Sequence, residues 1–170
     1  MSKLESGKVF SSAQCSDAQG LDVYRETLSL IERLHRQLLD MIKADLDKAG
    51  YTEVNNVQAL LLHNIGDNEL TAGELRAHGH YLGSNVSYNL KKLVDGGYIH
   101  HQRSEMDRRS VLVRLTPRGH AIRHMVSNLF QKHWQTLGSS VALRPESIKS
   151  LNAALRALEE FWNTRLNSPA

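Results

Sequence analysis

Hydroxyl, amide and ammonium side chains gather on one face of a helix that the hydrophobic periodicity predicts to begin near residue 84, and on the flanks of that face. They are Ser84, Asn85, Ser87, Tyr88, Lys91 and Lys92. Hydroxyl and amide groups both donate and accept hydrogen bonds and can read base edges, whereas ammonium groups mainly bind phosphates. The residue types thus predict a helix that enters the major groove of double-stranded DNA. The alternative is an ordinary solvated helix face.

Arginine side chains mark a second predicted DNA contact, on a β-hairpin that follows this helix. Alternating apolar and polar residues predict strands over 98–103 and 110–115. Arg103 ends the first strand, and Asp107, Arg108 and Arg109 lie at the tip. We expect this basic tip to lie against the duplex.

The positive charge of the chain is concentrated around these two features. Residues 91–123 contain eight Lys or Arg and three Asp or Glu, a balance of +5. Because the formal net charge of all 170 residues is +3, the remaining residues together carry −2. A uniformly solvated surface does not need that asymmetry, whereas a surface that neutralises phosphates does.

Local signals position the predicted DNA-binding helix. Its opposite face is apolar, with Val86, Leu90, Leu93 and Val94. Gly96 and Gly97 supply the left-handed backbone with which a helix commonly ends. Upstream, Thr71 and Glu74 form a capping box that predicts a short helix over about 72–78. Helix, turn and helix in this order is typical of a DNA-binding helix-turn-helix.

Other helix ends are also predicted from single residues. Asn55 or Asn56 caps a helix that stops at Gly66. Thr116-Pro117 is an N-cap followed by proline at the first helical position, so a helix begins directly after the hairpin. Pro145 starts the last helix.

Long amphipathic helices are predicted at both ends of the chain. Apolar residues recur every three or four positions over 21–50 and again over 117–166. We expect these helices to form a homodimer around a winged helix-turn-helix lobe at 54–116. Residues 1–20 are expected to be a flexible polar arm, and the whole chain a single domain. The alternative is that the apolar stripes pack only within the monomer.

Two motifs around the hairpin resemble those of the MarR family of winged-helix transcriptional regulators. Asp107-Arg108-Arg109-Ser110 matches the family's wing, and Leu115-Thr116-Pro117-Arg118-Gly119 matches the start of the next helix. The resemblance covers about residues 21–166. It implies a mainly α fold with a small β-hairpin wing, flanked by dimerisation helices, and a homodimer on a pseudo-palindromic operator. Residues 84–99 and the wing are similar to alphaproteobacterial regulators of L,D-transpeptidase and stress-tolerance genes.

The resemblance also implies roles for individual residues. In the wing, Asp107 is expected to orient Arg109 by a charge-assisted bond, while Arg108 or Arg109 reaches the minor groove or its phosphates. Small aromatic or phenolic effectors are expected to bind between the dimerisation helices and the DNA-binding lobe. The candidate effector residues are His35, Leu38, Leu61, Asn64 and Tyr81. Each of these could equally be a core or linker residue.

The single cysteine and the histidines suggest two other kinds of chemistry, redox sensing and metal binding. Cys15 is the single cysteine, so an intramolecular disulfide is impossible. Some MarR relatives sense peroxides through an N-terminal cysteine, which makes redox sensing an alternative, but no cation near Cys15 in sequence activates its thiolate. His120 and His124 are four apart on a helix, yet no carboxylate or second cysteine completes a metal-ligand set. We expect no metal and no other cofactor.

Composition and motifs exclude other classes of protein. No apolar run approaches the roughly 18 residues that span a bilayer, and the N-terminus lacks the apolar core of a secretion signal. We therefore predict a cytoplasmic protein with no membrane partner. No nucleophile elbow, Walker A motif, zinc-protease helix or dinucleotide fingerprint occurs, so we do not expect an enzyme. A helical protein–protein adaptor is the competing class, although it leaves the basic hairpin unexplained.

Overall fold

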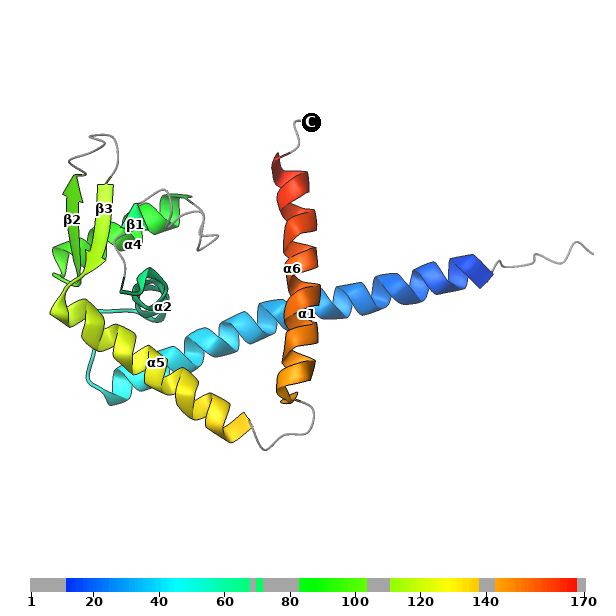
Figure 1. Ribbon diagram of the computed structural model, residues 1–170, viewed down its shortest axis with the longest axis horizontal. Coiled ribbons are helices and arrows are strands. Elements are labelled where there is room, and N and C mark those ends of the chain that lie inside the picture. The colour runs from blue at the N-terminus through cyan, green and yellow to red at the C-terminus, as the bar shows by residue number, and fades with distance from the viewer. Residues whose placement is uncertain (1–11, 68–69, 72–82, 104–110, 138–142, 168–170) are drawn as a thin grey trace, which may run out of the picture.

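A computed structural model describes residues 12–67, 70–71, 83–103, 111–137 and 143–167 of the chain (Figure 1). The elements are helices α1 (Ser12–Lys48), α2 (Asn56–Ile65), α4 (Gly83–Asp95), α5 (Pro117–Leu137) and α6 (Pro145–Asn167), and strands β1 (Leu70–Thr71), β2 (Ile99–Arg103) and β3 (Val111–Leu115). The mainly helical fold with a β-hairpin agrees with the fold predicted from the sequence. The predicted helix over 72–78 lies outside the described residues.

Helix ends follow the local signals closely. The side chain of Asn55 accepts a hydrogen bond from the backbone N–H of Gln58 at 2.9 Å, and Gln58 Oε1 accepts one from the backbone N–H of Asn55 at 3.1 Å. This capping box selects Asn55 over Asn56 as the cap of α2. At the end of α4, Gly97 has φ +71°, and the backbone N–H of Tyr98 bonds to the carbonyl of Leu93 at 2.8 Å. That pattern is a Schellman motif, which needs glycine at the left-handed position.

The three strands form one antiparallel sheet in the order β1-β3-β2. Ile99 pairs with Leu115 and Arg103 with Val111, so β2 and β3 form the predicted hairpin. Strand β1 was not predicted. Its two residues pair with the other edge of β3 through Leu70↔Val113 and Thr71↔Leu112, and two residues are too few to give an alternating pattern.

A single core joins α2, α4, α5, the sheet and the C-terminal half of α1. Its fully buried members include Ile42 and Leu46 of α1, Leu62 of α2 and Ile122 of α5. The core therefore fixes α4 and the β-hairpin relative to α5, which continues away from the sheet (Figure 1). No helix in the described ranges is both long enough and apolar enough to cross a membrane.

Helix α1 begins at Ser12, nine residues before the predicted start, so the prediction of a flexible arm over 1–20 is wrong for residues 12–20. The segment contains Ala13, Gln14 and Ala18, which favour helix, and no proline that would stop it. Gly20 is tolerated within the helix.

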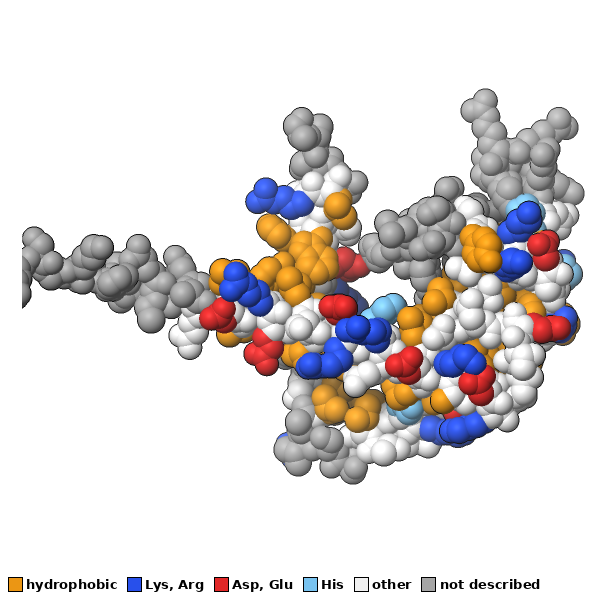
Figure 2. All heavy atoms as spheres, turned by 180° about the vertical axis from the view of Figure 1, so that it is seen from behind, with side chains coloured by type: hydrophobic (Ala, Val, Ile, Leu, Met, Phe, Trp, Pro, Cys, Tyr) orange, Lys and Arg blue, Asp and Glu red, His pale blue; other side chains and the backbone are white. Residues whose placement is uncertain are grey.

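Helix α6 and the first two thirds of α1 keep large apolar side chains in solvent. They are Leu21, Val23, Tyr24, Leu30 and Leu34 of α1 and Leu151, Leu155, Phe161, Trp162 and Leu166 of α6. The two helices touch where the indole N–H of Trp162 donates to Tyr24 Oη at 3.3 Å. Figure 2 shows hydrophobic side chains gathered where α6 crosses α1. Exposed apolar surface of this extent is typical of an interaction surface.

Candidate DNA-binding site

Helix α4 has the two faces that the sequence predicts. Leu90 and Leu93 are buried, and Val94 packs against the core. Ser87, Tyr88, Lys91 and Lys92 are exposed. Ser84 and Asn85 lie in the first turn of α4, but their side chains are outside what the structure describes. The described part of the polar face is thus accessible to a large ligand such as a duplex.

An aromatic ring and an ammonium group lie side by side on this face. Tyr88 is 61% exposed, and Lys92 Nζ lies 5.8 Å from the centroid of its ring. The contact is a cation–π interaction of the i,i+4 type, which holds the Lys92 ammonium close to the helix surface.

The β-hairpin adds an arginine and a histidine that the residue pattern of the sequence did not single out. His100 pairs with Arg114 across β2 and β3, and both side chains are exposed. Because cross-strand partners point to the same face of a sheet, they lie together at the base of the hairpin. The alternation of Arg114 with buried Val113 and Leu115 is the signal that could have identified it. Arg103 ends β2, but its side chain, like all of Asp107, Arg108 and Arg109, lies outside the described part.

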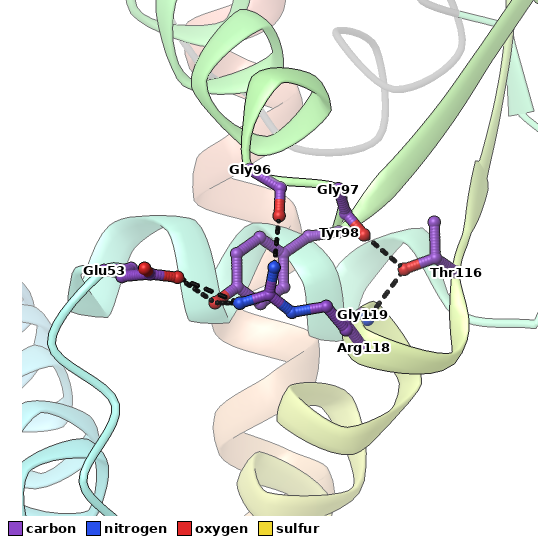
Figure 3. Close-up of polar contacts among 7 residues, drawn as sticks. All are labelled: Glu53, Gly96, Gly97, Tyr98, Thr116, Arg118 and Gly119. Carbon is purple, nitrogen blue, oxygen red and sulfur yellow. Dashed lines mark hydrogen bonds and ion pairs between the residues drawn. The ribbon is translucent and has the colours of Figure 1, made fainter.

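The side chain of Thr116 joins the end of α4 to the start of α5 (Figure 3). Thr116 Oγ1 donates to the carbonyl of Gly97 at 2.7 Å and accepts from the backbone N–H of Gly119 at 3.2 Å. The second bond is the predicted N-cap of α5. The first bond, which ties α5 to the Schellman turn, was not predicted. Thr116 therefore couples two helix ends that are about twenty residues apart in sequence.

The four predicted effector residues that the structure describes differ in their surroundings. His35 is exposed on α1, Leu38 packs against the core, and Leu61 is buried within it. Asn64 is exposed on α2, and Tyr81 lies outside the described residues. Leu61 faces inward because it lies on the apolar side of α2 together with Leu62 and Ile65.

A hollow of about 340 Å³ does open between α1 and α5, at a different place. Its lining combines apolar side chains with cations and consists of Met41, Ala44, Asp45, Lys48, Leu129, Lys132 and His133. None of the predicted effector residues contributes to it. Asp45 is paired with Lys48 at 3.5 Å, and α5 contributes the ammonium group of Lys132 and the imidazole of His133.

Cysteine and histidine form no metal site in the described ranges. Within them, no three His, Cys, Asp or Glu side chains are arranged to hold a metal ion. The rings of His120 and His124 lie with centroids 6.3 Å apart. His120 Nδ1 is 3.7 Å from Asp67 Oδ1, but Arg123 binds that oxygen at 2.7 Å. Cys15 lies in α1, and its side chain is not described.

His63 is a half-buried histidine between α2 and α5. Its Nδ1 lies 3.4 Å from Ser127 Oγ, and its ring meets Phe130 edge-on at a centroid distance of 4.9 Å. Burial, followed by the positive charge of Arg123, lowers the pKa of His63 below its ordinary value of 6.5.

This lowered pKa predicts a pH-dependent stability. Below about pH 6.5 the unfolded chain binds a proton at His63 more readily than the folded chain, so the free energy of unfolding should fall as the pH decreases toward the lowered pKa. The slope for one proton is at most about 1.4 kcal/mol per pH unit. Urea unfolding between pH 7.5 and 5.5 should show a smaller slope for His63→Gln. Ser127→Ala is the control and should keep the wild-type slope, because burial is the main cause. An equal slope in His63→Gln would contradict this assignment.

Comparisons with known proteins agree with this geometry. Residues 54–119 match the model of a family described as winged helix DNA-binding domain. Over 99 residues the chain is 42% identical to the exopolysaccharide II synthesis transcriptional activator ExpG of Rhizobium meliloti (strain 1021). That match covers 58% of this chain and 51% of the relative, so the chain spans about half the length of the curated relative it matches.

Solved structures share the fold over most of the chain. Streptococcus pneumoniae FabT in complex with DNA matches with a TM-score of 0.65 and 20% identity, over 82% of this chain and 97% of FabT. Staphylococcus aureus MarR in complex with salicylate and kanamycin also matches with a TM-score of 0.65 and 20% identity, over 86% of this chain and 97% of that protein.

The comparisons confirm the resemblance to MarR-type regulators that the wing motifs indicate: the relative is named a transcriptional activator, and the solved structures that share the fold include a MarR protein. Residues 54–119 thus match the winged helix DNA-binding domain family, and the described part of the chain has the fold of the solved MarR structures.

Proposed function

We propose that this chain is a transcriptional regulator that binds double-stranded DNA as a homodimer, at an approximately palindromic operator. The observation that carries the proposal is the exposed polar and basic face of α4, with Ser87, Tyr88, Lys91 and Lys92, beside a β-hairpin. Ser84, Asn85, Ser87 and Tyr88 contact base edges or phosphates, and Lys91 and Lys92 bind the backbone. As a regulator of genes, the protein acts in the cytoplasm.

The wing is the second contact in this proposal. Arg103, Arg108 and Arg109 reach the minor groove or its phosphates, and Asp107 orients Arg109. Arg114 extends the basic surface at the base of the hairpin, with His100 beside it on the partner strand. The DNA-binding lobe then comprises residues 54–116.

Dimerisation is proposed through the segments 21–50 and 117–166. The exposed apolar side chains of α1 and α6 support it, because a second copy of the chain would remove them from water. A two-fold dimer places its two α4 helices about one DNA turn apart, roughly 34–36 Å, which demands two related half-sites.

The role of α4 is tested by the salt dependence of DNA binding. The probes are a duplex selected by the wild-type protein from a random pool and an unselected random duplex. We expect Lys91→Ala to weaken binding to both duplexes and to reduce the slope of log K against log salt by about one per lost phosphate contact. Fluorescence anisotropy at several salt concentrations measures both quantities.

Lys149→Ala is the matched control, because Lys149 is exposed on α6, far along the chain from α4. It should leave both the affinity and the slope unchanged. If Lys91→Ala binds with the wild-type slope, Lys91 does not contact phosphate. If the wild-type protein enriches no sequence in the selection, the proposed function itself fails.

Ligand control is the finer part of the proposal. The hollow between α1 and α5 combines the apolar side chains of Met41 and Leu129 with the ammonium group of Lys132 and the imidazole of His133, which suits a small aromatic acid. An acid that prefers the free arrangement of the helices would release DNA by a population shift. Adding salicylate to the binding assay tests this, and unchanged affinity up to millimolar salicylate argues against it.

A further inference from the structure

Arg118, in the first turn of α5, binds the end of α4 and the connection between α1 and α2 at the same time (Figure 3). Its Nη1 donates to the carbonyl of Gly96 at 2.9 Å. Its Nη2 donates to Glu53 Oε2 at 2.9 Å and to Tyr98 Oη at 3.1 Å. One guanidinium group therefore connects three segments that are distant in sequence.

Tyr98 provides a rigid support for this group. The guanidinium carbon of Arg118 lies 4.6 Å from the centroid of the Tyr98 ring, and Tyr98 is 3% exposed. The Tyr98 hydroxyl also lies 3.4 Å from Glu53 Oε2. We call Glu53, Gly96, Tyr98 and Arg118 the Arg118 clamp. Because the ring is held in the core, the planar guanidinium has a fixed plane against which to orient the end of α4.

The clamp is poorly placed to contribute stability. The side chains of Arg118 and Glu53 are 59% and 68% exposed. Exposed ion pairs contribute little to the free energy of folding, because solvent screens them and two long side chains lose conformational freedom. A geometric role accounts better for a side chain that bonds to a helix-terminal carbonyl while stacked on a buried ring.

Helix α5 is held at a second point on the other side of α2. Arg123 Nη1 binds Asp67 Oδ1 at 2.7 Å, just after the end of α2, whereas Glu53 lies just before its start. The two ion pairs bracket α2 and hold it to α5. Since α5 is the first part of the proposed dimerisation segment 117–166, the clamp links the direction of α4 to the helices that would fix the spacing of the two protomers.

We propose that Arg118 is a positioning residue for DNA recognition: it fixes the direction of α4 relative to α5 without touching DNA. The proposal depends on the proposed function. Loss of the clamp lets α4 tilt about its last turn, so the base-reading side chains of its first turns are misaligned. Contacts with phosphates, which tolerate small shifts, persist.

The test compares Arg118→Met, Arg118→Lys and Glu53→Gln with wild type on the selected and the random duplex. We expect Arg118→Met to weaken binding to the selected duplex about tenfold, the loss of about one base contact. Binding to the random duplex should fall no more than in a variant that loses a positive charge elsewhere on the surface, and the salt slope should stay at the wild-type value. Arg118→Lys keeps the charge but loses the planar fork, so it should remain impaired.

Glu53→Gln gives the sharpest result, because a purely electrostatic effect and a loss of positioning would change the affinity for the selected duplex in opposite directions. Removing a negative charge strengthens binding to any duplex through long-range attraction. The clamp predicts instead a loss for the selected duplex, of about threefold if half of the Arg118→Met effect depends on Glu53. In amide NMR spectra, the resonances of Gly96 and Gly97 should shift in Arg118→Met and in Glu53→Gln relative to wild type.

Arg36→Met is the matched control, since Arg36 is an exposed arginine paired with Glu32 at 3.2 Å, and at 100° per residue it lies on the side of α1 opposite most of the exposed apolar side chains. It loses the same charge as Arg118→Met and should keep the wild-type preference for the selected over the random duplex. Equal losses on both duplexes with a reduced salt slope in Arg118→Met would overturn the proposal in favour of a direct phosphate contact. An unchanged affinity for the selected duplex, with only a lower melting temperature, would overturn it in favour of a purely structural role. A wild-type protein that selects no duplex refutes the proposed function instead.

Discussion

A protein carrying Leu151→Glu and Leu155→Glu together should be a folded monomer that binds its selected duplex at least a hundredfold more weakly than wild type. Both leucines lie on α6, and they are 52% and 36% exposed. Because neither is buried within the chain, the variant should keep its own fold. Two carboxylates on that stripe cannot be buried against a second copy without a large desolvation cost.

The predicted loss of DNA affinity is large because a monomer can bind only one of the two half-sites at a time. A dimer engages its second half-site at a high effective concentration, which raises affinity by about 10² to 10⁴ over one half-site alone. Light scattering on a size-exclusion column gives the mass, circular dichroism the helix content, and anisotropy the affinity for the duplex.

Ala153→Glu with Ala157→Glu is the control for this experiment. Both alanines are exposed on α6, and at 100° per residue they lie on the side opposite Leu151 and Leu155. The added charge is the same, so weaker DNA binding caused by charge alone would appear in both variants. A leucine variant that remains dimeric would show that α6 packs elsewhere.

Features that depend on neighbours in sequence were predicted well. The polar and apolar faces of α4 follow from the 3.6-residue period, and the turn at Gly97 follows from its left-handed backbone. The cap of α2 was narrowed to two residues, and the reciprocal bonds of Asn55 with Gln58 decide between them. In each case a few adjacent residues contain the whole signal.

Features that depend on long-range contacts could not be predicted. Strand β1 exists because residues 70–71 pair with β3, some forty residues later, and nothing local favours a strand there. The ion pair of Glu53 with Arg118 joins residues 65 positions apart. Charge patterns within a helix report neighbours three or four residues away, so they do not reveal such a pair.

The residues of the candidate sites also divide into those that one helix alone could predict and those that depend on the packing of two elements. Lys91 and Lys92 were identified from the face of a single helix, and their exposure agrees with that prediction. The effector set required knowing which side of α2 faces α1, and Leu61 lies in the core instead. Placing a site between two elements needs their packing, which the periodicity of each element does not contain.

Gly119→Ala should destabilise the protein by about 3 kcal/mol, although alanine is normally the better residue in a helix. A Cβ atom at Gly119 would lie 2.2 Å from the carbonyl oxygen of Tyr98. That oxygen accepts the backbone N–H of Thr116 at 3.1 Å, and the Tyr98 ring is held in the core. Neither the backbone at Tyr98 nor the first turn of α5 can therefore shift without a large loss of stability. To accommodate the added Cβ, the start of α5 must move away from the end of α4.

Gly20→Ala is the matched control, because Gly20 also lies within a helix but no atom lies within 4 Å of its added Cβ. That variant should gain stability, by up to about 1 kcal/mol, from helix propensity alone. Urea unfolding at one fixed protein concentration compares the two variants, since any dimerisation makes stability depend on concentration. Because the two variants are expected to change the free energy of unfolding in opposite directions, the comparison isolates the effect of the contact with Tyr98. If Gly119→Ala were as stable as Gly20→Ala, the close approach of α5 to the end of α4 would be wrong, and the Arg118 clamp built on that approach would lose its geometry.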